Sequence, residues 1–238
     1  MTTIALGDTH GRTYWKHILE QEPKANKIVF IGDYFDTFEP ISTDSQLANF
    51  LEILELKKQQ PQRVVLLMGN HDFHYLPNAQ ETYSGYKHFL ALLLQPYLQK
   101  AIDEQWLQIC HVEPPFLFSH AGVSSTWCQN HHIGTNLNPL AFTLAINNLL
   151  HTNLKAFAFA MGPNHSPYGD DACQGPLWIR PKSLFKDAVP GYTQVVGHTQ
   201  QAEMSISPKL TLIDTLGTAK TYLRIANGAM HEVPVPTI

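Results

Sequence analysis

Short apolar runs alternate with segments of helical periodicity over the first seventy residues. Residues 2–6, 27–31 and 63–68 are largely apolar, which is typical of strands that are buried on both faces. Between them, residues 14–22 and 44–60 have the spacing of helices, and each segment stops before a proline, Pro23 or Pro61. This alternation predicts an α/β core with parallel strands and right-handed crossovers.

The rest of the chain predicts more helices and then a change of character near residue 191. We expect a polar, aromatic loop at 73–86, a helix at 87–102, strands at 106–112 and 115–118, helices near 124–131 and 139–160, and a long surface loop at 161–175. The β-rich runs at 193–196, 209–213, 220–226 and 230–235 predict an antiparallel meander. Because no repeat or linker separates these parts, we expect a single domain over residues 1–238 with two β-sheets.

Composition excludes some function classes. The 238 residues are 44% apolar and 15% charged, with a net charge of −4, which is typical of a globular protein. The arginines are few and scattered (Arg12, Arg63, Arg180 and Arg224), so binding of long nucleic acids is not expected. The unusual feature is the presence of 13 histidines, since imidazole is the commonest transition-metal ligand and carries protons near neutral pH.

The cysteines and the first residues indicate the compartment. Cys110, Cys128 and Cys173 are odd in number and widely spaced, which argues against a disulfide framework and against a structural zinc site. The chain starts with a strand and a polar turn, without a signal-peptide pattern or a run of 18 apolar residues. We therefore expect a cytoplasmic protein with no membrane segment; the sequence does not indicate the oligomeric state.

Five of the predicted strands end in a polar cluster led by glycine or serine. The clusters contain Asp8 with His10, Asp33 with Asp36, Asn70 with His71, His120, and His198. In open α/β sheets, ligands bind outside the carboxyl ends of the strands, where these clusters lie. Carboxylate, amide oxygen and imidazole together suit divalent transition metals, and the set is large enough for two ions.

As motifs, the clusters are GD-x-HG, GD-x-x-D, GNHD, SHAG and GHT. In this order and at these separations, from residue 3 to about 225, they resemble the calcineurin-like metallophosphoesterases. The chain is most similar to the phosphoprotein phosphatase and bacterial diadenosine tetraphosphatase branch. This resemblance implies an α/β fold of the four-layer α+β type, in which two packed mixed β-sheets are flanked by helices and a dimetal site lies at the carboxyl ends of the strands.

The resemblance also implies which residues bind metal. One ion would be held by Asp8, His10 and Asp33. The other would be held by Asp33, Asn70, His120 and His198, so that Asp33 and a hydroxide bridge the two ions. Two such ions activate the water and stabilise an in-line displacement at phosphorus. Manganese, iron or zinc are the expected metals, because mixed oxygen and nitrogen sites accept several.

The expected general acid is His71, which is not a ligand in this scheme. It would protonate the leaving oxygen while Asp36 accepts its other N–H and fixes the tautomer. The alternative for Asp36 is a helix or turn cap. Asp214 resembles a family position behind the site, where a structural or outer-shell role is expected.

The sequence departs from the phosphoprotein phosphatases after Asp36. Those enzymes place Arg-Gly there, and the arginine grips the phosphate, whereas this chain has Thr37-Phe38. Arg180 resembles another phosphate-binding arginine of the family and is our candidate for this role; the alternative is an exposed arginine or one that pairs with Asp170 or Asp171. Gln200 stands where other branches have a second histidine.

These observations predict a metal-dependent phosphoesterase. The substrate remains open between a phosphomonoester, a small nucleotide or dinucleoside polyphosphate, and a phosphoprotein. Aromatic residues of the loop at 73–86 (Tyr75, Tyr83 and Tyr86) either stack on the substrate or simply pack within the loop. The alternative function is a non-catalytic scaffold with the same fold, which would be expected to have lost ligands or the acid.

Overall fold

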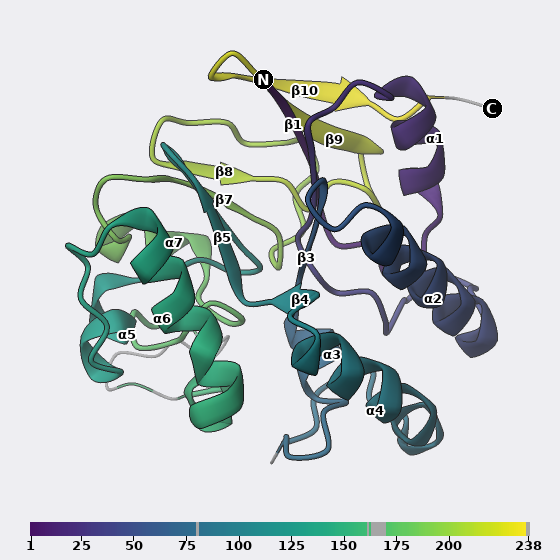
Figure 1. The fold of residues 1–238 in the computed structure, drawn as a ribbon, viewed down its shortest axis with the longest axis horizontal. Coiled ribbons are helices and arrows are strands. Elements are labelled where there is room, and N and C mark those ends of the chain that lie inside the picture. The colour runs from purple at the N-terminus through teal and green to yellow at the C-terminus, as the bar shows by residue number, and fades with distance from the viewer. Residues whose placement is uncertain (80, 161, 163–169, 237–238) are drawn as a thin grey trace.

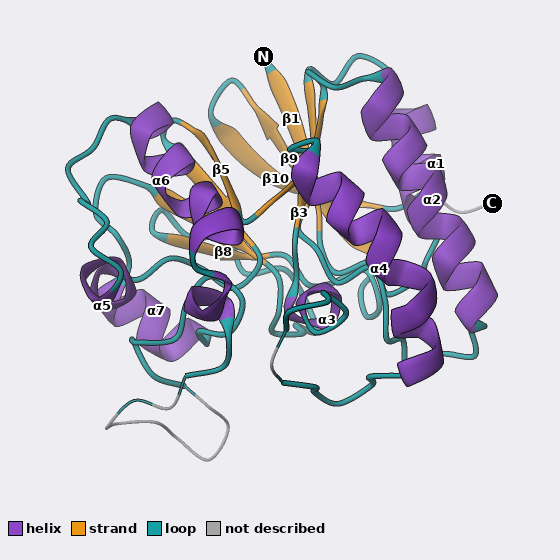
Figure 2. Cartoon of the chain, turned by 60° about the horizontal axis from the view of Figure 1, so that its bottom comes forward, coloured by secondary structure: helices purple, strands orange, loops and turns teal. Residues whose placement is uncertain are grey.

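The structure is a computed structural model that describes residues 1–79, 81–160, 162 and 170–236. Two β-sheets lie at its centre, and helices cover the outer side of each (Figures 1 and 2). This arrangement confirms the predicted fold class of two mixed sheets between helices.

The larger sheet has six strands in the order β10-β9-β1-β2-β3-β4. Its central strands β1 (Thr2–Leu6), β2 (Lys27–Phe30) and β3 (Val64–Leu67) are parallel, and β4 (Leu107–Gln108) extends them. On the other side β9 (Thr221–Ala226) runs antiparallel to β1 and forms a hairpin with β10 (Ala229–Pro234). The carboxyl ends of β1, β2 and β3 therefore meet at one edge.

The smaller sheet has four strands in the order β5-β6-β7-β8. The strands β5 (Cys110–Glu113) and β6 (Phe116–Ser119) are antiparallel, while β6, β7 (Thr193–Val196) and β8 (Leu210–Leu212) are parallel. The predicted antiparallel meander is wrong in this respect, because β7 and β8 pair in parallel and β9 and β10 belong to the other sheet. Strand pairing depends on long-range register, which local β-propensity does not contain.

Alternate side chains explain why the central strands are almost continuously apolar. In β1, Ala5 faces the second sheet and packs in a cluster with Val195 and Phe118. The neighbouring Ile4 and Leu6 point the other way, into the cluster beneath the helices. Both faces of these strands are thus buried, as expected for parallel strands covered on both sides.

The helices flank the two sheets. On the larger sheet lie α1 (Tyr14–Gln21), α2 (Thr43–Gln59) and α4 (His88–Asp103), while α5 (Ser125–Asn130), α6 (Pro139–Thr152) and α7 (Pro181–Asp187) lie on the smaller one (Figure 2). Two short helical segments, α3 (Asn70–Phe73) and the 3₁₀ helix η1 (Leu154–Phe157), complete the set in the described residues. None of the described helices has the length and the apolar character needed to cross a membrane.

The predicted strand at 106–112 is divided between the two sheets. The chain changes sheets at Ile109, where the N–H groups of Ile109 and Cys110 both donate to Oδ1 of Asn147 on α6, at 2.9 and 3.0 Å. This side chain satisfies backbone groups that would otherwise be unpaired at the bend. The helix predicted at 139–160 likewise ends early, at Thr152, because Asn153 leaves the helical conformation before η1. The predicted loop at 161–175 lies partly outside the described residues.

Candidate dimetal site

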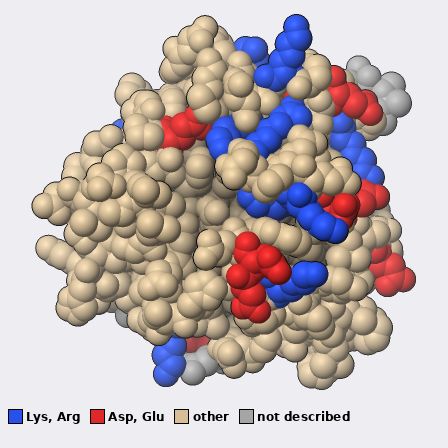
Figure 3. All heavy atoms as spheres, viewed as in Figure 1, with Lys and Arg blue, Asp and Glu red and all other residues tan. Residues whose placement is uncertain are grey.

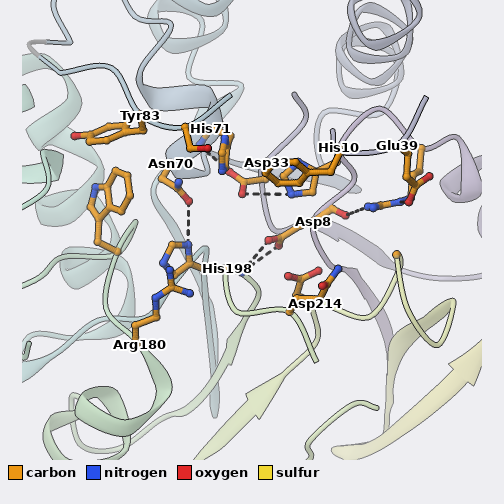
Figure 4. A pocket seen from close by; sticks show the side chains of 16 residues that line it. Asp8, His10, Asp33, Glu39, Asn70, His71, Tyr83, Arg180, His198 and Asp214 are labelled. Atoms are coloured by element: carbon orange, nitrogen blue, oxygen red, sulfur yellow. Dashed lines mark hydrogen bonds and ion pairs between the residues drawn. The ribbon is translucent and has the colours of Figure 1, made fainter. Parts of the chain in front are cut away.

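The six predicted metal ligands converge at the carboxyl ends of β1, β2, β3, β6 and β7, and Figure 4 shows Asp8, His10, Asp33, Asn70 and His198 among them. Five of the six line a cavity of about 590 Å³: Asp8, His10, Asp33, Asn70 and His198. The sixth, His120, is fully buried behind them. The sequence prediction that separate strand ends form one site is therefore consistent with the geometry.

Tight, left-handed turns bring these side chains together. The φ angles of His10, Asp33 and His198 are 44°, 52° and 61°, and Asp36 adopts 60°. Non-glycine residues rarely occupy this region, and a run of them at one site indicates strain that the surrounding fold maintains.

Glycine is required where two of these turns touch. A Cβ on Gly69 would lie 2.1 Å from Asp33 Oδ1 and 2.4 Å from Asp33 N. The φ angle of Gly69 is −100°, which any residue can adopt, so space and not conformation demands glycine here.

The carboxylate of Asp33 lies at the centre of the cluster. Its Oδ1 accepts a hydrogen bond of 2.9 Å from the N–H of His71. Its Oδ2 lies 3.5 Å from His120 Nε2 and 3.7 Å from His10 Nε2. Asp33 thus touches both groups of predicted ligands, which is the position a bridging carboxylate needs.

Three acceptor atoms, from His120, Asn70 and Asp33, face one another in the cluster. The Nδ1–H of His120 donates to the carbonyl of Ile31 at 3.1 Å, so the lone pair of Nε2 points inward. That Nε2 lies 2.9 Å from Asn70 Oδ1 and 3.5 Å from Asp33 Oδ2. A cation satisfies such a set of lone pairs, whereas hydrogen bonding alone leaves acceptors opposed.

The second imidazole on Asn70 belongs to His198, whose Nδ1 lies 2.9 Å from the same Oδ1. The other ring nitrogen of His198, Nε2, is buried and has no partner among the described residues. The N–H of His198 donates to Asp8 Oδ2 at 2.9 Å, which connects the turn after β7 to the turn after β1.

The buried carboxylates of this cluster are costly to ionise unless cations are bound beside them. Burial, followed by repulsion from Asp214 and Asp33, raises the pKa of Asp8 well above its usual value. Burial and then Asp33 raise the pKa of Asp214 to about 6. Among the described residues, neither carboxylate forms an ion pair with a lysine or arginine. Buried carboxylates without countercharge are costly, and metal ions relieve this cost.

The imidazoles and the central carboxylate show the complementary behaviour. Burial lowers the pKa of His10, His120 and His198, so these rings are neutral and able to bind a metal. Burial opposes ionisation of Asp33, but the surrounding imidazoles outweigh it and hold its pKa well below the usual value. The residues present therefore fit the dinuclear metal site that the motifs imply.

A second group of metal-binding residue types, Asp36, His71 and His74, lies beside the first. Here Asp36 Oδ2 is 3.0 Å from His71 Nδ1 and 2.7 Å from His74 Nε2, and Asp36 Oδ1 accepts the hydroxyl of Tyr75 at 2.6 Å, so both oxygens of Asp36 face proton donors. We therefore interpret this group as a hydrogen-bond network and not as a metal site. It includes the pair of His71 and Asp36 that the sequence predicts.

The protonation of His71 agrees with a role as an acid. Burial lowers its pKa, but the charges of Asp33 and Asp36 outweigh burial and raise it to about 9. Because Nδ1 is bound to Asp36, the other nitrogen, Nε2, is the one available to a substrate in the cavity, which His71 lines.

The candidate phosphate ligand Arg180 precedes α7 and also lines the cavity, where Figure 4 places it beside His198. Its Nη1 donates to Thr199 Oγ1 at 3.3 Å. It is partly buried, which lowers its pKa, and no ion pair fixes it among the described residues. Arg180 is therefore not a fully exposed side chain, and the charge of Asp170 acts on it; its role in binding phosphate stays a prediction.

The tyrosines of the loop after α3 pack on one another and on their neighbours, and Tyr83 also lines the cavity. The hydroxyl of Tyr75 donates to Asp36 Oδ1 at 2.6 Å, and its ring stacks on Tyr86 at 5.2 Å. Tyr83 packs between His74, at 5.9 Å, and Trp178, at 4.2 Å between ring centroids. The interpretation of loop packing is the one that the contacts support.

One important residue was not assigned a role from the sequence. The carboxylate of Asp72 is fully buried and accepts three backbone N–H groups, from Asp33, Tyr34 and Gly69, each at 2.8 Å. It therefore fastens the turn after β2 to the turn after β3. The only sequence signal was its place at the end of GNHD, since backbone donors leave no trace in residue types.

One wall of the cavity, at Glu39, was not predicted from the sequence. Figure 4 shows Tyr83 and Arg180 on one side and Glu39 on the other. Glu39 accepts a hydrogen bond of 2.7 Å from Nε of the buried Arg12, whose Nη1 donates to the carbonyl of Asp8 at 3.2 Å. A second arginine thus supports the metal side of the site. On the face seen in Figure 3, basic side chains are interspersed with acidic ones and most of the surface carries neither.

Comparison with known proteins agrees with this geometry. The sequence model of the calcineurin-like phosphoesterase family matches residues 1–201, so the chain belongs to this family and is a hydrolase of phosphoesters. No curated protein matches the chain.

Solved structures with the same fold include three phosphoesterases or phosphatases. A cold-active protein tyrosine phosphatase is 20% identical, with a TM-score of 0.59, and the alignment covers 97% of this chain and 77% of that one. A protein serine/threonine phosphatase from Saccharomyces cerevisiae is 14% identical, with a TM-score of 0.56 and coverage of 100% and 81%. A metallophosphoesterase from Sphaerobacter thermophilus is 14% identical, with a TM-score of 0.50 and coverage of 99% and 90%.

Proposed function

We propose that this protein is a dinuclear metal-dependent phosphatase in which His71 is the general acid. The observation that carries the proposal is the position of His71 between two carboxylates. Its backbone N–H binds Asp33 at 2.9 Å, and its Nδ1 binds Asp36 at 3.0 Å. The acid is thereby held at a fixed place relative to the carboxylate at the centre of the site.

The residues that would hold the ions are those that the motifs imply. One ion would be held by Asp8, His10 and Asp33, and the other by Asp33, Asn70, His120 and His198. When bound, such ions lower the pKa of a water molecule and stabilise charge on phosphoryl oxygens. Manganese, iron or zinc is the proposed occupant, since the donor set is oxygen and nitrogen without thiolate.

The chain's own residues then divide the remaining work. Arg180 binds the non-bridging oxygens of the phosphoryl group, as an arginine suits a planar array of oxygen acceptors. His71 gives its Nε2 proton to the leaving oxygen, while Asp36 keeps the ring in the required tautomer and orientation. The carboxylate of Asp72 accepts the N–H groups of Asp33 and Gly69 and so holds their two turns together.

For the substrate we propose a phosphomonoester or a small nucleotide. The support is a cavity of about 590 Å³ whose walls include Phe38, Tyr83 and Trp178. Cavities of this size bury a small molecule rather than a flat protein surface. A phosphoprotein is the second candidate, since two of the structures of similar fold carry the name of a protein phosphatase.

We further propose that residues 1–238 form one catalytic domain and that the protein acts in the cytoplasm. The family match reaches residue 201, and β9, which follows it, pairs directly with the central strand β1. All three cysteines are unpaired, as in proteins of reducing compartments.

The experiment is to measure hydrolysis of p-nitrophenyl phosphate and bis-p-nitrophenyl phosphate by manganese-loaded protein. Asp33→Asn should lose metal and activity together, whereas His71→Ala should keep its metal and lose activity mainly on esters with poor leaving groups. Matched controls are Asp103→Asn and His88→Ala, which alter exposed residues that do not line the cavity. A metal-free, inactive wild-type protein would support the scaffold alternative instead.

A further inference from the structure

The three-donor arrangement around Asp36 has a member with no role in the proposed reaction. His74 lies one turn beyond His71, and its side chain is fully buried. Its Nε2 is 2.7 Å from Asp36 Oδ2, the same oxygen that binds His71 Nδ1 at 3.0 Å. Two imidazoles therefore share one carboxylate oxygen.

The tautomer of His74 follows from its other nitrogen. The backbone N–H of Tyr83 donates to His74 Nδ1 at 3.3 Å, so Nδ1 is an acceptor and carries no proton. The proton of the neutral ring is then on Nε2. This nitrogen has no well-aligned partner in the described part of the chain, and Asp36 is the acceptor within reach. His74 consequently presents an N–H to Asp36.

The other side of the carboxylate is fixed as well. Tyr75 donates to Oδ1 at 2.6 Å, and its own oxygen accepts the N–H of Lys87 at 3.2 Å. Gly85 covers the remaining side, because a Cβ there would lie 2.9 Å from Asp36 Cγ. Asp36 can therefore neither rotate nor exchange its partners for water without losing a buried hydrogen bond.

We propose that His74 is a positioning residue that holds Asp36, and through it His71, in the orientation needed to protonate the leaving group. This inference rests on the proposed function. A carboxylate that orients an imidazole works only when its own plane is fixed, and the Nε2–H of His74, 2.7 Å from Oδ2, is placed to hold that plane. The packing of His74 against Tyr75, at 4.4 Å, and Tyr86, at 5.2 Å, holds the donor in turn.

Two substitutions separate positioning from simple packing. His74→Phe keeps an aromatic ring among the tyrosines but removes the N–H donor. His74→Gln removes the ring but keeps an N–H at a similar reach. Positioning predicts that the glutamine variant retains most activity and that the phenylalanine variant does not, whereas a packing role predicts the reverse order.

The leaving group supplies the specific readout. For His74→Phe we expect kcat on an alkyl phosphate, which needs the acid, to fall about 10- to 100-fold, the range typical of lost outer partners. On p-nitrophenyl phosphate, which leaves readily, we expect a fall of less than about threefold, with KM unchanged. An equal loss on both esters, with a full metal content in each variant, would overturn the proposal.

A second readout does not depend on turnover. In the metal-free protein, NMR should show a hydrogen-bonded proton on His71 Nδ1 that exchanges slowly with water in the wild type and in His74→Gln, and rapidly in His74→Phe. If the proton stays protected in His74→Phe, the inference is wrong even where the enzyme is active. If the wild type has this proton but hydrolyses no phosphoester, the proposed function fails while the orienting contact stands.

Discussion

Replacing Gly69 with alanine tests the geometry of the site through a single methyl group. The Cβ would lie 2.1 Å from Asp33 Oδ1, whereas ordinary contacts begin near 3.4 Å, so the carboxylate has to move by about 1.3 Å. The φ and ψ angles of Gly69, −100° and 174°, are open to alanine, but the Cβ would also lie 2.4 Å from Asp33 N, so the backbone of the turn after β2 has to move as well.

The displacement falls on the residue that we place between the two ions. A shift of about 1 Å at a reacting centre typically costs about 100-fold in rate. We therefore expect Gly69→Ala to lower kcat/KM on p-nitrophenyl phosphate at least about 100-fold and to weaken metal binding. Overpacking also destabilises a protein by about 1–3 kcal/mol. Thermal unfolding of the metal-free variant measures this part separately.

The matched control is Gly134→Ala. The nearest atom to a Cβ at Gly134 is Asn136 Oδ1 at 3.1 Å, the end of a flexible side chain. This variant should match the wild type in metal content, rate and unfolding temperature. A Gly69→Ala protein that binds two ions per chain and turns over normally would refute the packing argument.

Four further changes have expected outcomes. Asp72→Asn leaves a backbone N–H opposite an amide N–H, so it should destabilise the metal-free protein by about 1–3 kcal/mol in urea unfolding. The control Asp103→Asn should have no effect. Equal stability of the two variants would contradict the role of Asp72. The folded-state pKa of His71 is raised to about 9, so its protonation stabilises the metal-free fold fully below about pH 6.5, and this contribution is lost as pH rises to about 9. The stability difference between wild type and His71→Gln in chelator should therefore shrink between pH 6 and pH 9.5; a difference that does not depend on pH would rule out the raised pKa. Arg180→Ala should raise KM for phosphate esters about 10- to 100-fold with a smaller change in kcat, and unchanged inhibition by inorganic phosphate would argue against the clamp. Removal of metal should lower the unfolding temperature, since an ion at 100 times its dissociation constant stabilises the fold by about 2.7 kcal/mol; an unfolding temperature insensitive to chelator would count against the ions.

The central strands and the strand-end clusters were predictable from sequence for one physical reason. Parallel strands buried on both faces are continuously apolar, so their ends are visible where glycine and polar residues begin. Asp8, Asp33 and Asn70 follow three such strands, and parallel pairing brings their ends to one edge. The position of these residues directly after apolar strands was thus enough to predict that they lie close together.

Other features depend on contacts that residue types do not encode. The division of the strand at 106–112 follows from Asn147, a residue nearly forty positions away. The role of Asp72 follows from backbone donors, and the shell of Asp36 follows from the fold of the loop that contains His74. The parallel pairing of β7 and β8 is likewise a matter of tertiary register.

The central claim is that loops from separate strands hold two metal ions around Asp33 and that this assembly hydrolyses phosphoesters. Titration of the metal-free protein with manganese, with bound metal and p-nitrophenyl phosphate turnover measured on the same samples, tests it most directly. The account predicts that turnover develops with the second equivalent of metal in the wild type and is absent, with reduced metal binding, in Asp33→Asn. Turnover without bound metal, or two tightly bound ions in Asp33→Asn, would contradict it.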